Sequence, residues 1–485
     1  MSFNSLQFLV FFPVVLLLYF ATPHRHRWVL LLIASYYFYG CWKVEYLFLL
    51  VAATLIDYFA GILIDQSTDQ RQRRLFLTLS LASNLGLLFA FKYASFVSDS
   101  LRSAFNAFNI SYSIPAFHVL LPVGLSFYTF QSMSYAIDVY RGKKRAERHL
   151  GIFALYVSFF PQLVAGPISR SGHLLPQLRE THHFDWDNFR NGFFLALWGF
   201  FKKIVIADRV AVYVDAVYDH PADHTGAPVI LASVFFAVQI YCDFSGYSDI
   251  AQGTARMMGF RLVDNFKRPF AARTMREFWQ RWHISLTRWI MDYLYAPLAR
   301  KVRDKWHGYL ITLFVFTVLG LWHGAAWHFV MFGAFVGLGL VVGDVTRPAR
   351  KRVTDVLFPA GNPVLQSVHH AVQVIVTFGL FVCASILFRV NHIGDVRILV
   401  SHMFTNLDVR PSAFIMQQFE AYEMVLALLV LVTLGTVEWL QERWPIFERF
   451  SGRPLWAQCA LSYALMYSIL MFGEFSLKPF IYFQF

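Results

Sequence analysis

The sequence predicts an all-α protein that crosses a membrane many times. Apolar residues make up 57% of its 485 residues and charged residues only 15%, and the mean hydropathy is +0.47. A soluble domain is about 45–50% apolar and about 25% charged. The apolar residues also gather in long blocks, several of them near the ~20 residues that a helix needs to cross the hydrocarbon layer. Lipid is therefore the solvent for most of this chain.

The apolar blocks are the elements that we expect to be helices. They run at 6–22, 28–40, 46–64, 75–97, 119–139, 192–213, 228–245, 309–343, 368–388, 421–440 and 455–473. About 10–12 helices are expected to cross the membrane, whereas the short block 28–40 is expected to be tilted or interfacial. No internal repeat and no soluble-domain linker interrupts the blocks. Residues 1–485 are therefore predicted to form a single integral membrane domain.

Basic loops set the expected orientation. Lys and Arg gather at 24–28, 69–74, 141–149, 246–308, 347–352 and 442–454, and the positive-inside rule assigns such loops to the cytoplasm. Both termini then lie outside, on the side of the membrane away from the cytoplasm. These loops account for the net charge of +12, so no nucleic-acid partner is expected. The four cysteines lack metal-ligand spacing, and no metal site is expected.

Two apolar segments have basic residues on both flanks. Segment 309–343 must therefore enter and leave on the cytoplasmic side, as two full spans or as a deep hairpin. Segment 155–170 has the same flanks and is broken by Pro161, Gly166 and Pro167. We expect it to be re-entrant, with protein or water covering its backbone.

The block "GLWHGAAW" contains the most informative side chain. His323 follows a long apolar run and should lie deep in the bilayer, at the turn of the predicted hairpin. An ionisable group there indicates function, and the alternative is a histidine that only hydrogen-bonds within the helix bundle. Gly320 and Gly324 flank it and leave room for a substrate, whereas His328 is interpreted as structural.

The stretch "REFWQRWHISLTRWIMDYLYAPLARK" (276–301) predicts one amphipathic helix in the plane of the membrane interface. An apolar stripe recurs every three or four positions, at Phe278, Trp282, Leu286, Trp289 and Tyr293. His283 lies beside this stripe, and both a functional and a structural role are open for it. The basic residues could attract a polyanionic donor such as a nucleotide-phosphate cofactor, although positive-inside charge alone also explains them.

A third block, 238–270, places polar groups at the end of a span. Asp243 is a carboxylate at such a depth, and it should be paired or line a water-filled cavity. Asn265 follows in "DNFKRPF", ahead of a proline turn.

Several ordered motifs resemble the membrane-bound O-acyltransferase family. They read "YCDFSGYSDIA", "EFWQRWHISLTRWI" and "GLWHGAAW", and "LLPVGLSFYTFQSMSYAIDVYRG" and "FPQLVAGPISR" extend the resemblance along nearly the whole chain. Within the family the chain is most similar to the branch of alginate O-acetyltransferase membrane subunits. It departs from that branch at "DYLYAPLARKVRDKW", where relatives often carry a Gly-Gly-Asn-Arg stretch.

The resemblance implies a ring of helices around a central tunnel, with re-entrant and interfacial helices and a catalytic core at about 119–345. It implies an O-acetyltransferase that takes acetyl groups from cytoplasmic acetyl-CoA and holds no permanent cofactor. The group would pass to a periplasmic partner with a serine-hydrolase-like site, for O-acetylation of an exopolysaccharide such as alginate.

The resemblance also assigns roles to residues. His323 matches the catalytic histidine and is expected to act as general base on an acceptor hydroxyl, with transient acetylation of its ring as the less favoured variant. His283 matches the second motif position and would orient donor or acceptor. The residues assigned to substrate binding are Trp322, Asn265, Asp243, Trp279 and Arg281.

The chain ends in "KPFIYFQF", within a tail at about 474–485. Its aromatic residues suit an anchor at the membrane interface. "FIYF" also resembles a Phe-x-Tyr-Phe ending seen in this family and its small partner proteins, where the tyrosine is implicated as an acyl relay. Tyr482 is that residue here, and Pro479 would end the last helix and turn the segment back.

Three other functions stay open at this point. The same histidines would serve transfer of D-alanine or another acyl group to a cell-wall polymer. A polymer or proton transporter would work without CoA, and no inverted repeat of broken helices supports it. A scaffold that docks a polymer synthase would tolerate His323→Ala.

Overall fold

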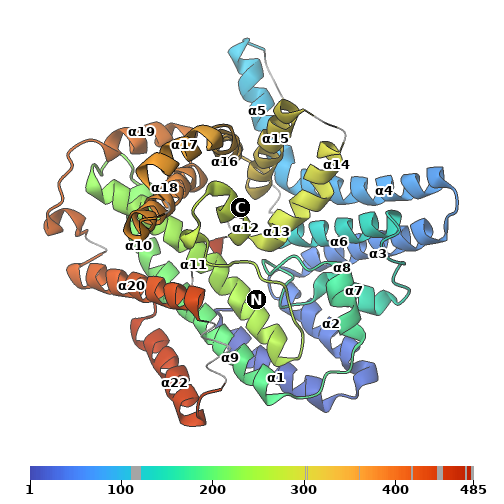
Figure 1. The fold of residues 1–485 in the computed structure, drawn as a ribbon. Coiled ribbons are helices and arrows are strands. Elements are labelled where there is room, and N and C mark those ends of the chain that lie inside the picture. Colours follow the sequence, from blue (N-terminus) through green and yellow to red (C-terminus); the bar gives the residue numbers. More distant parts are fainter. Residues whose placement is uncertain are drawn as a thin grey trace. The chain divides into compact units, whose positions relative to one another are not determined.

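A computed structural model describes most of the chain, and its regular structure is helical. The described residues are 1–110, 122–300, 302, 304–359, 361–416, 419–444, 452–475 and 478–481. In these ranges every named element is a helix, beside one isolated bridge between Met416 and Phe419. The all-α prediction is confirmed (Figure 1).

The helices group into two compact units. The first comprises Met1–Ala196 and Tyr247–Val263, and the second Leu197–Gly246 and Asp264–Ile481. The single domain, the ring and the tunnel stay predictions.

The first unit is built mainly from the N-terminal helices. They are α1 (Leu6–Ala21), α2 (His24–Gly40), α3 (Val44–Gln66), α4 (Gln70–Leu88), the π-helical turn η1 (Phe89–Tyr93), α5 (Ala94–Ala107), α6 (Leu125–Tyr140), α7 (Leu150–Ser158), α8 (Ser171–Arg179) and most of α9 (Trp186–Phe200).

The second unit holds the remaining helices. They are η2 (Phe201–Ala207), α10 (Asp208–Tyr218), most of α11 (Ala227–Met257), η3 (Pro269–Ala271), α12 (Met275–Arg281), α13 (Ile284–Ile290), η4 (Met291–Tyr295), α14 (Ala296–Ala299), α15 (Lys305–His323), α16 (Trp327–Val345), α17 (Arg347–Leu357), α18 (Pro363–Arg389), α19 (Ile393–Met403), η5 (Pro411–Phe414), α20 (Ala421–Arg443) and α22 (Leu455–Phe472).

Eight helices among the described residues are long and apolar enough to cross a membrane, so the chain is a multi-pass membrane protein. They coincide with seven of the predicted blocks, because block 309–343 supplies two of them. Block 6–22 forms the shorter apolar helix α1. Blocks 28–40, 119–139 and 192–213 also form helices, but these are not among the eight.

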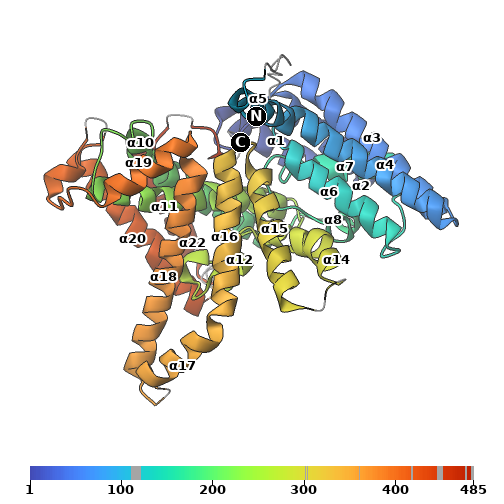
Figure 2. The same ribbon diagram turned by 90° about the horizontal axis from the view of Figure 1, so that it is seen from above.

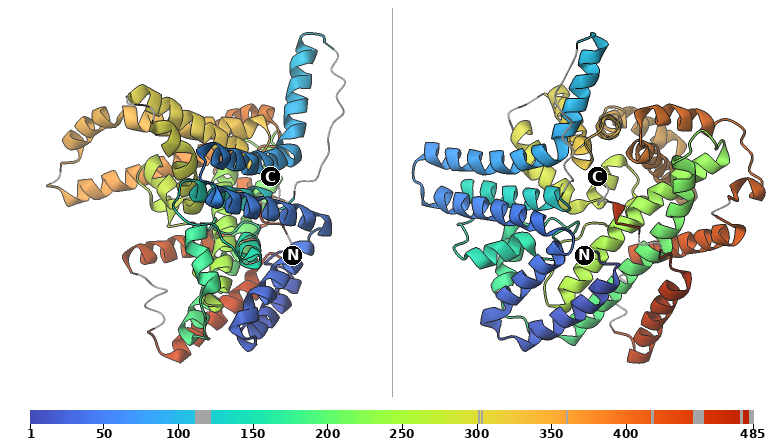
Figure 3. Two further views of the ribbon diagram at one scale, coloured as in Figure 1. Left: turned by 90° about the vertical axis from the view of Figure 1, so that its right-hand side faces the viewer. Right: turned by 180° about the vertical axis from the view of Figure 1, so that it is seen from behind.

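A polar cluster joins two neighbouring spans of the first unit. Asp57 on α3 is fully buried and accepts hydrogen bonds from Ser80 (2.6 Å) and Asn84 (2.9 Å) on α4. A buried carboxylate is costly unless such donors satisfy it, so these bonds set how α3 and α4 face each other. Figure 3 shows the two helices side by side, and α5 turning sharply away from α4.

In the second unit, α15 and α16 form the predicted hairpin (Figure 2). Gly320 and Gly333 face each other across it, because a Cβ on Gly320 would lie 2.8 Å from the Cα of Gly333. Small residues at such a crossing let two membrane helices approach closely. The expectation that Gly320 leaves room for a substrate is therefore wrong, because the backbone of α16 fills that space. The prediction that 309–343 enters and leaves on one side as a hairpin is consistent with this geometry.

The prediction of one continuous helix over 276–301 is wrong. The chain breaks between α12 and α13 at His283, which has a left-handed backbone with φ 42°. Backbone hydrogen bonds to the preceding segment replace the helical ones: Lys267 N–H donates to Arg281 O (2.9 Å), and Ile284 N–H donates to Asn265 O (2.8 Å). The apolar stripe is nevertheless buried, from Phe278 to Tyr293.

The hairpin crossing generates a stability prediction. Gly333→Ala should lower the thermal unfolding temperature of the purified protein, because its Cβ would meet the Phe316 carbonyl oxygen and would lie 2.9 Å from the Gly320 backbone. Overpacking of this kind costs about 1–3 kcal/mol. Gly339→Ala on the same helix is the matched control, since nothing lies within 4 Å of its Cβ position. Equal unfolding temperatures for the two variants would contradict the close crossing.

Candidate active site

Two buried histidines lie near one indole ring in the second unit. His323 is the last residue of α15, and His283 immediately precedes α13. The ring centroid of Trp322 lies 4.9 Å from that of His323 and 6.4 Å from that of His283. The structure therefore brings together three of the residues predicted for the site.

Aromatic rings from two further helices enclose His323. Phe332 on α16 and Phe388 on α18 lie 5.9 Å and 5.4 Å from its imidazole, centroid to centroid. Only 6% of His323 is exposed. The imidazole thus lies at the turn of the hairpin, as the sequence predicts, and the structure adds its aromatic environment.

Asn265 positions His283. Its side-chain oxygen accepts hydrogen bonds from His283 Nδ1 (2.9 Å) and from the Ser285 hydroxyl (2.8 Å). The backbone N–H of Ser285 approaches the same oxygen at 3.4 Å, and because that group can only donate, it supports oxygen at this position. Asn265 therefore acts on a histidine, and its predicted role in substrate binding stays a prediction.

These contacts define the protonation of His283. With Nδ1 donating to Asn265, the neutral ring carries its lone pair on Nε2. Burial lowers the pKa of His283 well below its ordinary value, and the nearby His323 lowers it further. The neutral imidazole, which can accept a proton, is thereby favoured at neutral pH.

Trp279 and Arg281 lie on α12, before the break. Trp279 is buried, and its ring packs against Phe316 on α15 with centroids 5.4 Å apart. Its indole N–H has no hydrogen-bond partner among the described residues, so it could donate to a bound group. Arg281 instead forms ion pairs with Glu277 (2.7 Å) and Glu442 (3.5 Å). Binding of substrate by either residue stays a prediction.

Asp243 belongs to a buried charge cluster, as its depth predicted. Lys203 Nζ donates to Asp243 at 2.6 Å and to Asp208 at 2.8 Å, and all three side chains are at most 5% exposed. A charge so deep needs an opposite partner, because removal of one member leaves an uncompensated buried charge.

The cluster also holds the chain just before its end. The backbone N–H of Ile481 donates to the second oxygen of Asp243 at 2.8 Å, and the Phe480 ring lies 4.6 Å from Lys203 Nζ. Lys478 adds a 2.6 Å ion pair with Asp215. Three contacts thus anchor residues 478–481, and Tyr482 lies outside the described residues. The expectation that Pro479 ends the last helix is wrong, because α22 already ends at Phe472.

Lys203 and Asp208 were missed in the sequence. The signal was present, because "FKKIVIADR" sets four charged side chains into the apolar block 192–213. Charged residues inside membrane segments are costly and mark function or pairing. Their partner, Asp243, lies on a different helix, and only the fold brings them together.

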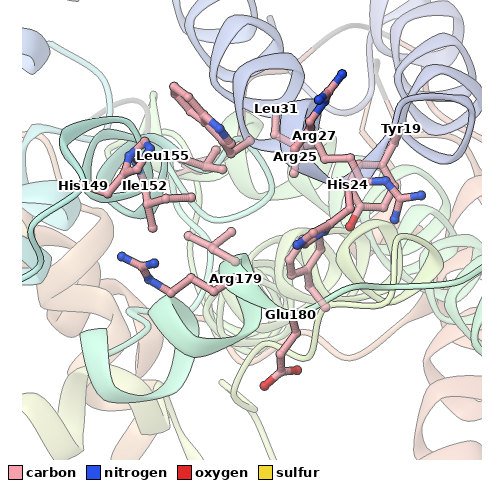
Figure 4. A pocket seen from close by; sticks show the side chains of 13 residues that line it. Tyr19, His24, Arg25, Arg27, Leu31, His149, Ile152, Leu155, Arg179 and Glu180 are labelled. Atoms are coloured by element: carbon pink, nitrogen blue, oxygen red, sulfur yellow. Dashed lines mark hydrogen bonds between the residues drawn. The ribbon is translucent and has the colours of Figure 1, made fainter.

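The first unit has a cavity of about 180 Å³ between α2, α7 and α8 (Figure 4). Two of its three arginines are already engaged: Arg179 pairs with Glu147, and Arg27 donates to the carbonyl oxygens of Thr22 and His182. None of the predicted site residues lines it.

The Asn265 contact generates a prediction for the purified protein. Asn265→Ala removes the acceptor for His283 Nδ1 and should lower the kcat/KM of acyl transfer about 10- to 100-fold, the cost of an unsatisfied buried donor at the site. Ser285→Ala is the matched control, since it removes another bond to the same oxygen and leaves His283 in place. Equal losses in both variants would show that Asn265 only stabilises the fold.

Comparison with known proteins places the chain in a family. The family model described as "MBOAT, membrane-bound O-acyltransferase family" matches residues 146–388. The chain is 41% identical over 351 residues to the probable alginate O-acetylase AlgI of Azotobacter vinelandii, which covers 72% of this chain and 69% of that protein. It is 35% identical over 508 residues to the probable alginate O-acetylase AlgI of Pseudomonas putida, over the full length of both.

A relative with another named activity is the peptidoglycan O-acetyltransferase of Helicobacter pylori. It is 35% identical over 339 residues, covering 64% of this chain and 63% of that protein. The matched family segment contains His283, His323 and Asn265. The chain therefore belongs to the membrane-bound O-acyltransferase family and is an O-acyltransferase.

Proposed function

We propose that this protein takes acetyl groups from cytoplasmic acetyl-CoA and delivers them across the inner membrane for O-acetylation of an alginate-like exopolysaccharide. The observation that carries the proposal is the pair of buried histidines around Trp322. The polymer is proposed from relatives that are named alginate O-acetylases. Membership of an O-acyltransferase family argues against the transporter and scaffold alternatives.

In this proposal His323 is the general base. It accepts the proton of the acceptor hydroxyl while that oxygen attacks the thioester carbonyl. The carbon–sulfur bond then breaks, and the proton passes from His323 to the CoA sulfur, so that free CoA leaves and the imidazole is neutral again. Its aromatic surroundings exclude water, which would otherwise hydrolyse the thioester.

His283 would act beside it as a positioned neutral imidazole. Asn265 fixes its ring. Its Nε2 lone pair would then accept a hydrogen bond from the acyl donor or from the molecule that receives the acyl group. Transfer of D-alanine or another acyl group would need the same two histidines, and the identity of the released acyl carrier distinguishes these reactions.

Tyr482 is proposed as the first acceptor. Its phenol oxygen would take the acetyl group, and a serine hydroxyl of a periplasmic partner would then attack the aryl ester and regenerate the phenol. The anchored segment Lys478–Ile481 supports this role, because it fixes the chain immediately before Tyr482. With both termini in the periplasm, the ester would form on the side where the polymer is modified.

The central role of His323 predicts that His323→Ala slows CoA release from labelled acetyl-CoA by about 10²- to 10⁴-fold, the contribution of a general base, while expression and unfolding temperature stay close to those of the parent. His328→Ala is the matched control. His328 is also a buried histidine of the same hairpin, but its Nδ1 donates to the Leu387 carbonyl oxygen at 3.0 Å, which fits a structural role. CoA release by the purified His323→Ala protein at the parent rate would overturn the assignment.

The relay predicts that Tyr482→Phe loses acetylation of the polymer but keeps the fold of the protein. The variant keeps an aromatic ring but lacks the phenol oxygen, so cells that carry it should secrete polymer without acetyl esters. The protein itself should remain folded in the membrane. Phe480→Leu, which keeps an apolar side chain at the anchored segment, controls for a general defect of the tail. Normal polymer acetylation by Tyr482→Phe would leave the tail as an anchor alone.

A further inference from the structure

The second unit contains a large basic cavity that the proposed reaction does not use. It has a volume of about 870 Å³ and is lined by the end of α16, by α17, by the first half of α18 and by the segment that begins α12. Figure 2 shows α17 joining the ends of α16 and α18. Neither histidine of the candidate site nor Trp322 lines this cavity.

Its lining is strongly cationic. Five basic side chains and one carboxylate line it: Arg273, Arg276, Arg347, Arg350, Lys351 and Asp344. Asp344 is ion-paired with Arg276. The remaining four cations have no carboxylate in the lining to neutralise them, so the cavity has a positive potential that favours an anion.

Helix α17 presents one face to the cavity. Arg347, Arg350, Lys351 and Thr354 line it, at the spacing of one side of an α-helix. Val356 lies on the opposite side of the same helix and is 79% exposed. A short basic helix with an exposed apolar side chain on its far side, joined directly to a membrane span, is suited to the headgroup layer.

Two of these cations have no internal role. Arg350 donates to the Gly343 carbonyl oxygen (2.6 Å) and to the Thr346 hydroxyl (3.1 Å), which stabilises the end of α16. The side chains of Arg347 and Lys351 have no hydrogen-bond or ion-pair partner among the described residues. Their charges are therefore available to a ligand.

The lining also has an apolar part, which continues onto outward-facing helix surfaces. Leu340 on α16 is buried at the base, while Val372, Val376 and Leu380 on the membrane-spanning α18 are 46%, 55% and 38% exposed. A ligand that fills the whole cavity must combine an anionic head with hydrocarbon. The positive-inside rule places residues 347–352 at the cytoplasmic face, where anionic lipids attract basic segments.

We propose that this cavity binds an anionic phospholipid, with its phosphate between Arg347 and Lys351 and its acyl chains along α16 and α18. The recognised group is a phosphate, and the alternative sources of phosphate are inorganic phosphate and CoA. The apolar lining favours the lipid over the first, and the absence of the candidate catalytic residues from the lining favours it over the second.

The test measures lipid bound to the full chain, purified in neutral detergent, by native mass spectrometry. Phosphatidylglycerol is the probe and phosphatidylcholine the zwitterionic comparison. The parent should retain phosphatidylglycerol in preference, and the double variant Arg347→Gln/Lys351→Gln should bind it roughly 10- to 30-fold more weakly. Arg352→Gln on the same helix, outside the cavity lining, should bind as the parent does. CoA release by the double variant in detergent should equal that of the parent.

Several results would overturn the proposal. Equal retention of the two lipids by the parent, or equal loss of binding in the Arg352→Gln control, would show that α17 attracts anions without a site. Displacement of phosphatidylglycerol by inorganic phosphate at equal concentration would show that the acyl chains contribute nothing. Displacement of phosphatidylglycerol by CoA, together with slower CoA release in the double variant, would show that the cavity binds acetyl-CoA, the acyl donor.

Discussion

One amide oxygen determines the geometry of the candidate site. Asn265 accepts hydrogen bonds from His283 and Ser285, while its backbone carbonyl accepts from Ile284. Together these bonds interrupt what would otherwise be one amphipathic helix and hold His283 in a left-handed conformation. A strained backbone persists only where its surroundings determine it, and such places are commonly functional. The break brings His283 to Trp322 and His323, which belong to the hairpin.

A second constraint is the pairing of charge in the interior. Lys203 is shared by Asp208 and Asp243, and Asp243 in turn accepts from the backbone of Ile481. The carboxylate thereby has two functions, since it neutralises a buried cation and holds the last described residues of the chain. This arrangement ties the interior of the second unit to Ile481, the residue before the proposed relay residue in the sequence.

The sequence predicts those features that depend on local pattern. The position of His323 at a hairpin turn follows from the basic flanks of one long apolar block, and the burial of the stripe from Phe278 to Tyr293 follows from its spacing. The break at His283 could not be predicted in this way, because the group that causes it lies 18 residues earlier in the chain. The pairing of Lys203 with Asp243, across 40 residues, has the same origin. At His283, tertiary hydrogen bonds break the helix that the regular spacing of apolar residues over 276–301 predicts.

The central claim is that His283 and His323 work as one unit around Trp322. A double-mutant cycle of CoA release from acetyl-CoA, with His283→Ala, His323→Ala and both together, measures this most directly. Residues that act as a unit give strongly non-additive losses, so the double variant should be no slower than His323→Ala alone. A double variant whose loss equals the product of the two single losses would show that the histidines act independently, and would contradict the account.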